Sequence, residues 1–442
     1  MIPIINYPSQ EAETFLKKLA QRSFRGSVKD VESKVEEIID RVANEGDKAV
    51  IAYTRQLDWP EATLDRIIVS EEEIEIACQQ IDPAFMEIIK AASKNIAAFH
   101  EKQLEKSWFT TGSGGVILGQ MVSPVASAGI YVPGGKGGNT PLISSLIMGA
   151  IPAIIAGVND IVIATPPRSD GSIHEAILAT AKELGIKTIY RMGSAWAIAA
   201  LAIGTESIRK VDVIVGPGNI YVTTAKKLLS GVVGIDILAG PSEILVIADQ
   251  SADPDYIAAD LLSQAEHDPM ASAMLITTSK KLAEDTVKSI ASQIDGTPFW
   301  SPLPRKDVVI QSLNNYGACF LVDSLDVAVT LANRIAPEHL ELHIDDPWKF
   351  IGHIRSAGAI FIGQFTPEPV GDYFAGPNHV LPTAGTARFA SALGVHTFLR
   401  KTSIIYYTEE TTRSYVDDIA RFARMEGLEA HARSVEIRAK KV

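Results

Sequence analysis

Apolar residues recur every three to four positions through most of residues 1–110, and this spacing predicts amphipathic helices. The same rhythm returns at residues 412–438 and predicts a second helical segment near the C-terminus. The C-terminal unit is too small to bury a core of its own, so we expect it to pack on a neighbour in the same chain or in a second copy.

Between these helical segments the pattern changes to short β-branched runs separated by helical stretches of about 10 to 15 residues. A first block runs from 126–132 (ASAGIYV) to 221–229 (YVTTAKKLL), and a second runs from 243–249 (EILVIAD) to 357–363 (AGAIFIG). This alternation is typical of a parallel sheet with helices on both faces. The sequence therefore predicts an α/β fold with two Rossmann-like, doubly wound domains, which bind ligands at the carboxyl ends of their strands.

Residues 141–158 form an uncharged stretch that is as long as a membrane span. Pro152 interrupts the stretch, and the strand-like sequence DIVIAT follows it at 160–165. We interpret the stretch as a buried helix that leads into a strand, and we expect no membrane partner.

Charge and cysteine content narrow the class of protein. The 442-residue chain carries a formal charge of −12 with Lys and Arg interleaved among acidic residues, so no basic stripe favours nucleic acid as a partner. The two cysteines, Cys78 and Cys319, cannot build a disulfide framework, which suits a reducing compartment. The N-terminal residues lack the pattern of a signal peptide. These features predict a cytoplasmic globular enzyme.

Gln264 and His267 form the first candidate site. Asp253 followed by Pro254 is typical of a helix start, and the pair then lies three positions apart near the end of that helix. Side chains at this spacing project from one face and can hold one metal ion. The same spacing also occurs on solvated helix faces, so it leaves a metal site and an exposed face both open.

Six of the nine histidines lie at or after residue 339, and this concentration favours a site. Glu338 and His339 stand side by side after Pro337, which ends the preceding helix. A carboxylate and an imidazole in a turn can share proton transfer near neutral pH. An exposed surface pair would have the same spacing.

Two later segments combine acidic and imidazole side chains. The Gly/Pro-rich loop VGDYFAGPNHVLPTAGTARF contains Asp372 and His379, and irregular loops inside a compact enzyme are often functional. The segment MEGLEAHARS contains Glu426 and His431, which are unremarkable by themselves on an exposed helix.

Glycine-rich turns follow three of the predicted strands, at 132–138, 216–219 and 239–243. Glycine lets the backbone approach a ligand, and a helix N-terminus after the turn favours phosphate. None of the turns matches GxGxxG with an acidic residue about 20 positions on, so they do not identify a nucleotide.

Seven segments in a fixed order resemble the histidinol dehydrogenase family, over a range from about residue 25 to the C-terminus. They are GIYVPGG, VGPGNIYVTTAK, AGPSEILVIAD, DLLSQAEHDP, NRIAPEHLEL, GDYFAGPNHVLPT and EGLEAHA. So many long motifs in order are far more specific than any single pattern.

The resemblance implies a zinc- and NAD+-dependent enzyme that oxidises L-histidinol, via L-histidinal, to L-histidine with two NAD+, the last steps of histidine biosynthesis. His339 is implied as the base that takes the alcohol proton, and Glu338 as the base that activates water to hydrate the aldehyde. One metal ion per subunit, zinc or alternatively manganese, is implied with a mixed set of nitrogen and oxygen ligands. These ligands are Gln264, His267, Asp372 and His431.

The resemblance also assigns contacts to substrate and cofactor. The implied substrate contacts are the four metal ligands and His339, together with Ser242, His379 and Glu426. The implied NAD+ contacts are Tyr131, Trp196 and Asn219. Trp196 stands where the family has a glutamine, and the glycine-rich loop near residue 135 is longer than the family's loop. An indole cannot accept the hydrogen bonds that an amide accepts, although it can stack.

A homodimer with shared active sites is implied as well, in which Glu426 and His431 come from the partner subunit. We expect an N-terminal helical arm at 1–25 and a C-terminal helical dimerisation segment at 386–442. Between them, a Rossmann-like domain formed by 26–130 and 238–385 should carry the metal and acid/base residues, and a Rossmann-like domain at 131–237 should bind NAD+.

Two other functions fit parts of the pattern. A paralogue that oxidises another polar alcohol, such as a sulfonated diol, is favoured only by the two departures from the family on the cofactor side, Trp196 and the longer glycine-rich loop. A two-lobed, non-catalytic small-molecule-binding protein would also have twin α/β domains. Such a binding protein would not need the acid/base pair Glu338 and His339 beside a group of metal ligands.

Overall fold

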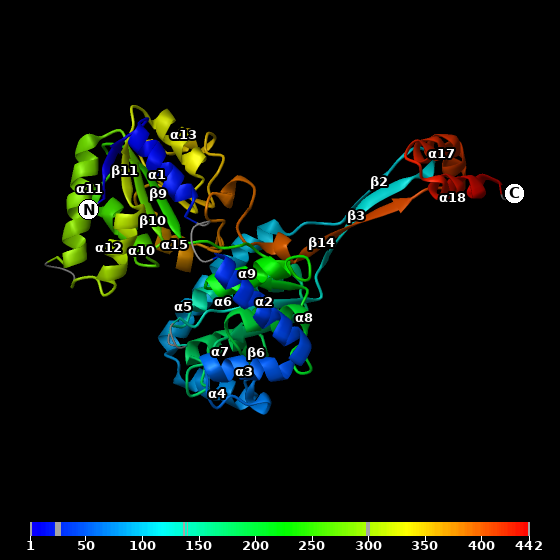
Figure 1. Cartoon of the computed structure of the whole chain (residues 1–442). Helices are drawn as coiled ribbons and strands as arrows, with labels where there is room; N and C mark the ends of the chain where they lie inside the picture. The colour runs from blue at the N-terminus through cyan, green and yellow to red at the C-terminus, as the bar shows by residue number, and fades with distance from the viewer. Residues whose placement is uncertain (1, 23–27, 136–137, 139, 298–300, 441–442) are drawn as a thin grey trace.

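The computed structural model describes residues 2–22, 28–135, 138, 140–297 and 301–440. It contains two parallel sheets, each covered by helices, and a long antiparallel arm that reaches away from both sheets and ends in the C-terminal helices (Figure 1). The arrangement confirms the predicted α/β class with two doubly wound units.

The first sheet has six parallel strands in the order β1-β11-β10-β9-β12-β13. The strands are β1 (Ile4–Asn6), β9 (Glu243–Ala248), β10 (Ser272–Thr277), β11 (Ala318–Leu321), β12 (His339–His343) and β13 (Ala359–Ile362). One face is covered by α10 (Pro254–Ala265), α11 (Lys280–Asp295) and α12 (Lys306–Tyr316), and the other by α1 (Gln10–Ala20) and α13 (Leu325–Ile335). All residues of β9 and β10 are buried, as expected for central strands with both faces covered.

Strand β12 differs from its neighbours because it carries polar residues on one face. It pairs with β9 so that His339 lies opposite Ile244, Glu341 opposite Val246 and His343 opposite Ala248. Those β9 residues belong to the core beneath α10. Since alternate residues of a strand share a face, the three polar side chains of β12 lie on the α10 side of the sheet.

The second sheet has five parallel strands in the order β6-β5-β4-β7-β8. The strands are β4 (Ser127–Tyr131), β5 (Asp160–Thr165), β6 (Thr188–Arg191), β7 (Val213–Val215) and β8 (Gly234–Ile235). One face packs against α6 (Ile143–Ala156) and α7 (Glu175–Glu183), and the other against α8 (Ser194–Ile203) and α9 (Ile220–Leu229).

The uncharged stretch at 141–158 folds as α6, which is almost wholly buried and is followed directly by β5. This confirms its interpretation as a buried helix that leads into a strand. In the described part of the chain, no helix has both the length and the apolar character needed to cross a membrane.

The described residues of the N-terminal region do not divide between the two sheets as the sequence predicts. Residues 4–6 of the expected helical arm form β1, which extends the six-stranded sheet by pairing with β11. Helices α2 (Val28–Glu45), α3 (Asp47–Leu57), α4 (Glu71–Gln80) and α5 (Pro83–His100) pack around the five-stranded sheet. Their apolar stripes meet the helices of that sheet, so residues 28–100 join the unit that contains 127–235.

The arm is a three-stranded antiparallel ribbon in the order β14-β3-β2. Its strands are β2 (Trp108–Thr111), β3 (Ile117–Pro124) and β14 (Leu399–Tyr406), and β14 leads into α16 (Glu409–Ser414), α17 (Val416–Met425) and α18 (Glu429–Lys440). The C-terminal segment expected to be helical at 386–442 therefore contains a long strand, β14, ahead of its three α-helices. The terminal helices share a small core of Ala420, Ala423 and Ala432.

Candidate active site

His339 begins β12 and is 3% exposed. Its Nδ1 lies 2.9 Å from the carbonyl oxygen of Glu243, which can only accept, so Nδ1 carries the proton. Nε2 is buried and has no hydrogen-bond partner among the described residues. Burial lowers the pKa of His339, which leaves the ring neutral with a lone pair on Nε2. This is the state that a general base requires.

Glu338 precedes His339 and is paired with a second buried glutamate. The backbone N–H of Glu243 donates to Glu338 Oε2 at 2.9 Å, and the N–H of Glu338 donates to Glu243 Oε2 at 3.2 Å. Arg22 forms an ion pair with Glu243 and neutralises it. Burial, Glu243 and more distant carboxylates raise the pKa of Glu338 well above its usual range. Glu338 Oε2 lies 3.7 Å from His339 Nδ1.

Gln264 lies at the end of α10, which begins after the N-cap Asp253 as the sequence predicts. Its side chain is completely buried, yet Oε1 and Nε2 both have no hydrogen-bond partner in the described part of the chain. An unpaired buried amide costs about 1–3 kcal/mol, so such a group is usually satisfied by a ligand. His267 lies one residue beyond the C-cap of α10 and is exposed.

Asp372 lies on α15 (Glu368–Tyr373), a helix packed against α10. One potential ligand atom each of His267, Glu368 and Asp372 lies within 4.8 Å of the others. Burial, followed by the charge of Glu368, raises the pKa of Asp372 to about 8. The structure therefore brings His267 and Asp372 together and adds Glu368, which the sequence analysis missed. The signal was present, because Glu368 precedes Asp372 by four positions, the spacing of one helical face.

His379 follows α15, and its Nδ1 donates to the carbonyl oxygen of Asp372 at 3.0 Å. Burial lowers the pKa of His379 to about 4, so the ring is neutral at pH 7. Ser242 is half-buried immediately before β9. The neighbouring residues of the predicted site thus include one neutral imidazole and one hydroxyl suited to a polar substrate.

The predicted acid/base pair and three of the four predicted metal ligands lie at the amino ends of the six-stranded sheet. Glu338 and His339 precede or begin β12, and Ser242 precedes β9. These residues do not lie at the carboxyl ends of the strands, where the sequence pattern predicts ligand binding. The Gly/Pro-rich loop after α15 crosses this edge, where the N–H of Gly240 donates to Thr383 Oγ1 at 2.6 Å. The same loop reaches the other sheet, because Asn378 Nδ2 donates to the Met148 carbonyl of α6 at 2.7 Å.

Tyr131 and Asn219 lie at the carboxyl ends of the five-stranded sheet. Tyr131 ends β4, and its hydroxyl accepts a hydrogen bond from Ser194 N–H at 3.0 Å. Asn219 is the exposed N-cap of α9, and its Oδ1 accepts from Tyr221 N–H at 3.0 Å. Gly216 follows β7 directly, has φ +117° and lies against the backbone of Tyr131. A Cβ at Gly216 would lie 2.1 Å from the Tyr131 carbonyl oxygen. This close approach requires glycine.

Trp196 lies in the core on one face of the five-stranded sheet. The side chain is 2% exposed, its Nε1 donates to Thr54 Oγ1 at 3.2 Å, and its ring stacks on Tyr53 with centroids 5.9 Å apart. The indole points from α8 into the core beneath α3, and its contact with NAD+ stays a prediction. Residues 136, 137 and 139 of the longer glycine-rich loop lie outside the described residues.

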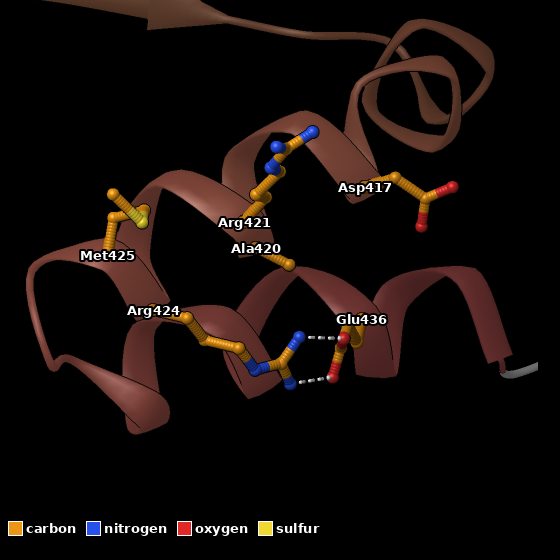
Figure 2. A pocket seen from close by; sticks show the side chains of 6 residues that line it. All are labelled: Asp417, Ala420, Arg421, Arg424, Met425 and Glu436. Carbon is orange, nitrogen blue, oxygen red and sulfur yellow. Dashed lines mark hydrogen bonds and ion pairs between the residues drawn. The ribbon is translucent and has the colours of Figure 1, made fainter.

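Glu426 and His431 are exposed in the helical unit at the far end of the arm, distant from the other predicted site residues of the same chain (Figure 1). A hollow between α17 and α18 is lined by Asp417, Ala420, Arg421, Arg424, Met425 and Glu436 (Figure 2). Arg424 spans it with hydrogen bonds of 2.9 and 3.1 Å to Glu436. The hollow contains none of the predicted site residues.

Comparisons with known proteins agree over nearly the whole chain. The family model described as histidinol dehydrogenase matches residues 21–439. Histidinol dehydrogenase of Desulfotalea psychrophila is 51% identical over 432 residues, or 98% of each chain. That of Oleidesulfovibrio alaskensis is 54% identical over 408 residues, covering 92% of this chain and 93% of that protein. A crystal structure of histidinol dehydrogenase from Elizabethkingia anophelis matches with a TM-score of 0.90 and 38% identity, covering 99% of this chain and 98% of the other.

Proposed function

Since the chain belongs to the histidinol dehydrogenase family, we propose that it oxidises L-histidinol through L-histidinal to L-histidine, with two NAD+ as oxidants. The protein is an NAD-dependent oxidoreductase that acts on an alcohol and an aldehyde. The observation that carries the proposed residue roles is the buried His339, whose Nε2 is an unpaired acceptor and whose Nδ1 lies 3.7 Å from Glu338 Oε2.

His339 serves as the base in the alcohol oxidation. Its Nδ1–H is held by the Glu243 carbonyl, so the ring orientation and the tautomer are set before substrate binds. Nε2 accepts the hydroxyl proton as the substrate carbon loses hydride. Glu338 serves in the aldehyde oxidation, in which its carboxylate removes a proton from the water that adds to the carbonyl carbon. A carboxylate of raised pKa is a stronger base toward water.

The donor set around α10 and α15 suits one zinc ion per subunit, and the same nitrogen and oxygen donors suit manganese. The unpaired buried amide of Gln264 and the close approach of His267 to Asp372 both support a ligand there. Gln264, His267 and Asp372 would hold the ion together with His431 of the partner subunit. A bound zinc ion would orient the substrate by binding its nitrogen atoms.

The remaining polar groups at this edge suit the two ends of histidinol. We assign Ser242 and the neutral His379 to substrate contact, together with Glu426 of the partner subunit, whose carboxylate suits an ammonium or imidazole group. The carboxylate of Glu426 of the partner subunit and the neutral ring of His379 favour different groups of histidinol. Binding both groups would orient the alcohol carbon toward His339.

We assign NAD+ to the carboxyl ends of the five-stranded sheet, at Tyr131 and Asn219, where the turn at Gly216 brings two strand ends together. NAD+ held there would supply the acceptor for the hydride that each oxidation removes from the substrate carbon. Trp196 and Tyr131 are both buried in the same core, but only Tyr131 ends a strand at this edge of the sheet, so Trp196 is left out of this assignment.

A homodimer with two shared sites explains the arm. Glu426 and His431 are too far from α10 and α15 of their own chain to join that site (Figure 1). Large apolar side chains along the arm and its helices are exposed, a property of surfaces that bind another protein. They include Trp108, Phe109, Ile405, Tyr406, Phe422 and Met425. Covering this surface with a second copy would place each arm against the other subunit.

The alternative of a paralogue with another polar alcohol as substrate is not favoured. Its support was the altered cofactor side, that is, the substitution at Trp196 and the longer glycine-rich loop. Trp196 lies in the core, and relatives named histidinol dehydrogenase are 51% and 54% identical over most of the chain. We place the enzyme in the cytoplasm, because Cys78 and Cys319 are both free thiols and suit a reducing compartment.

The proposed function is tested by incubating the zinc-loaded protein with L-histidinol and NAD+ and measuring NADH formed per L-histidine. We expect a ratio of about two, because each oxidation removes one hydride. A ratio well above two with accumulation of the aldehyde, or no turnover of histidinol by the folded dimer, would contradict the proposal.

A further inference from the structure

A second group of titratable side chains lies on the α10 face of β12, beneath the candidate active site. Glu341 in the middle of β12 is completely buried, and His343 and Asp260 of α10 are nearly so. His343 Nε2 lies 3.3 Å from Glu341 Oε2 and 3.7 Å from Asp260 Oδ2. In the described part of the chain, no Lys or Arg forms an ion pair with either carboxyl group.

The two carboxyl groups of this cluster lie close together, since one oxygen of each and one ring nitrogen of His343 are all within 4.8 Å of one another. Burial raises the pKa of each carboxyl group to about 8. At neutral pH the cluster therefore retains a proton, and Glu341 can act as a hydrogen-bond acceptor without a buried cation beside it.

Glu341 accepts a hydrogen bond from the first residue of α15. Pro367 precedes the helix and supplies no side-chain cap. The backbone N–H of Glu368 instead donates to Glu341 Oε1 at 2.9 Å, and the Ser263 hydroxyl of α10 donates to Glu368 Oε2 at 3.0 Å. Strand β12 and helix α10 thus each hold one part of Glu368. Since α15 has only 6 residues, these outside contacts fix its place.

We propose that Glu341 is a positioning residue for the metal site: it holds the start of α15 so that Asp372, one helical turn later, faces His267 just after α10. Asp260 and His343 keep the Glu341 carboxylate in place. The inference rests on the proposed function, which assigns a zinc ion to His267 and Asp372. Glu341 itself binds neither metal nor substrate.

The test compares Glu341→Gln, which keeps the Oε1 acceptor, with Glu341→Met, which has a similar volume and no acceptor. Zinc affinity of each full-length dimer is measured by competition with a chromophoric chelator, and NADH binding by fluorescence. We expect Glu341→Met to bind zinc about 10-fold or more weakly, as loss of a supporting contact commonly does. Glu341→Gln should bind zinc nearly as the unchanged protein does, and NADH binding should be unchanged in both.

Glu73→Met is the matched control, because Glu73 Oε2 accepts the Ser70 N–H at the start of α4, a helix packed on the other sheet. It should leave zinc affinity unchanged. If Glu341→Met does not fold, Ser263→Ala removes the other contact of Glu368 and should weaken zinc binding in the same direction.

Equal zinc affinity of Glu341→Met and the unchanged protein would overturn the positioning role while leaving the proposed function intact. A second equivalent of zinc in the unchanged protein that disappears in Glu341→Gln would also overturn it, because the cluster would then hold a cation. Absence of specific zinc binding by the unchanged dimer would overturn the proposed metal site itself.

Discussion

At the scale of single residues, the site depends on groups whose protonation is set by burial. His339 is neutral because it is enclosed, and the Glu243 carbonyl selects the tautomer with a lone pair on Nε2. Glu338 is held by the backbone of Glu243, which lies 95 positions earlier in the chain. The sequence predicted Glu338 and His339 as a pair, because they are adjacent. It could not predict Glu243, because only the pairing of β9 with β12 brings it near.

Replacing His339 with Asn should lower kcat for histidinol oxidation by about 10²- to 10⁴-fold, the usual loss when a general base is removed. Asn retains polarity and can accept no proton at the Nε2 position. Steady-state kinetics with NAD+ measure the effect. His353→Asn, which changes an exposed histidine of the same sheet region, should have no effect. A comparable kcat in His339→Asn would show that another group is the base.

The pH profile of aldehyde oxidation should reflect Glu338. The pKa of Glu338 is raised, so its carboxylate form appears only as the pH rises above the ordinary glutamate range of about 4.3. The rate should therefore increase with pH through the raised pKa. In Glu338→Gln this step should vanish and the rate should be low throughout, as measured with L-histidinal between about pH 5 and 9. Persistence of the same step in Glu338→Gln would assign it to another group.

At the scale of elements, the sequence predicted what local patterns encode and missed what distant pairing creates. The buried helix α6 and most strands of both sheets follow from apolar runs and their alternation, whereas β1 lies in a segment that was expected to be helical. The arm does not, because β14 pairs with β3 across most of the chain, with Leu399 opposite Pro124. Neither strand has a buried face that would give a clear period of two.

The turn after β7 gives a stability prediction. Lys226 of α9 and Asp236 after β8 form a buried ion pair, and they hold Gly216 from both sides, with Lys226 Nζ 3.0 Å from its carbonyl oxygen and Asp236 Oδ2 2.8 Å from its N–H. Asp236→Leu leaves a buried lysine without its partner and should lower the free energy of unfolding by about 3–5 kcal/mol.

The double variant Lys226→Met, Asp236→Leu removes both charges and should be more stable than Asp236→Leu alone. Asp285→Asn, which breaks the exposed pair with Lys281, should cost less than about 1 kcal/mol. Urea denaturation monitored by circular dichroism measures all three. A single variant as stable as the double variant would mean that the ion pair does not hold this turn.

At the scale of the whole molecule, one chain contains all the parts of a site but not in one place. The acid/base pair and three proposed metal ligands gather at the amino ends of the six-stranded sheet, whereas Glu426 and His431 lie at the end of the arm (Figure 1). The sequence could predict the arm's helices but not their distance from the sheet, because that distance is set by the long-range pairing of β3 with β14.

The central claim, that each active site combines two chains, is tested by complementation between two inactive variants. His339→Asn and His431→Ala are each expected to form inactive dimers. In a mixed dimer, one site has both defects and the other has neither. Random pairing of equal amounts makes half of the dimers mixed, so the mixture should recover about a quarter of the original activity if the dimer is two-fold symmetric.

The measurement is NADH formation from L-histidinol after the two variants are unfolded together and refolded, with each variant refolded alone as the control. Recovery of activity only in the mixture is the predicted result. No recovery in a mixture shown to contain mixed dimers would mean that His339 and His431 act within one chain, which would contradict the shared site.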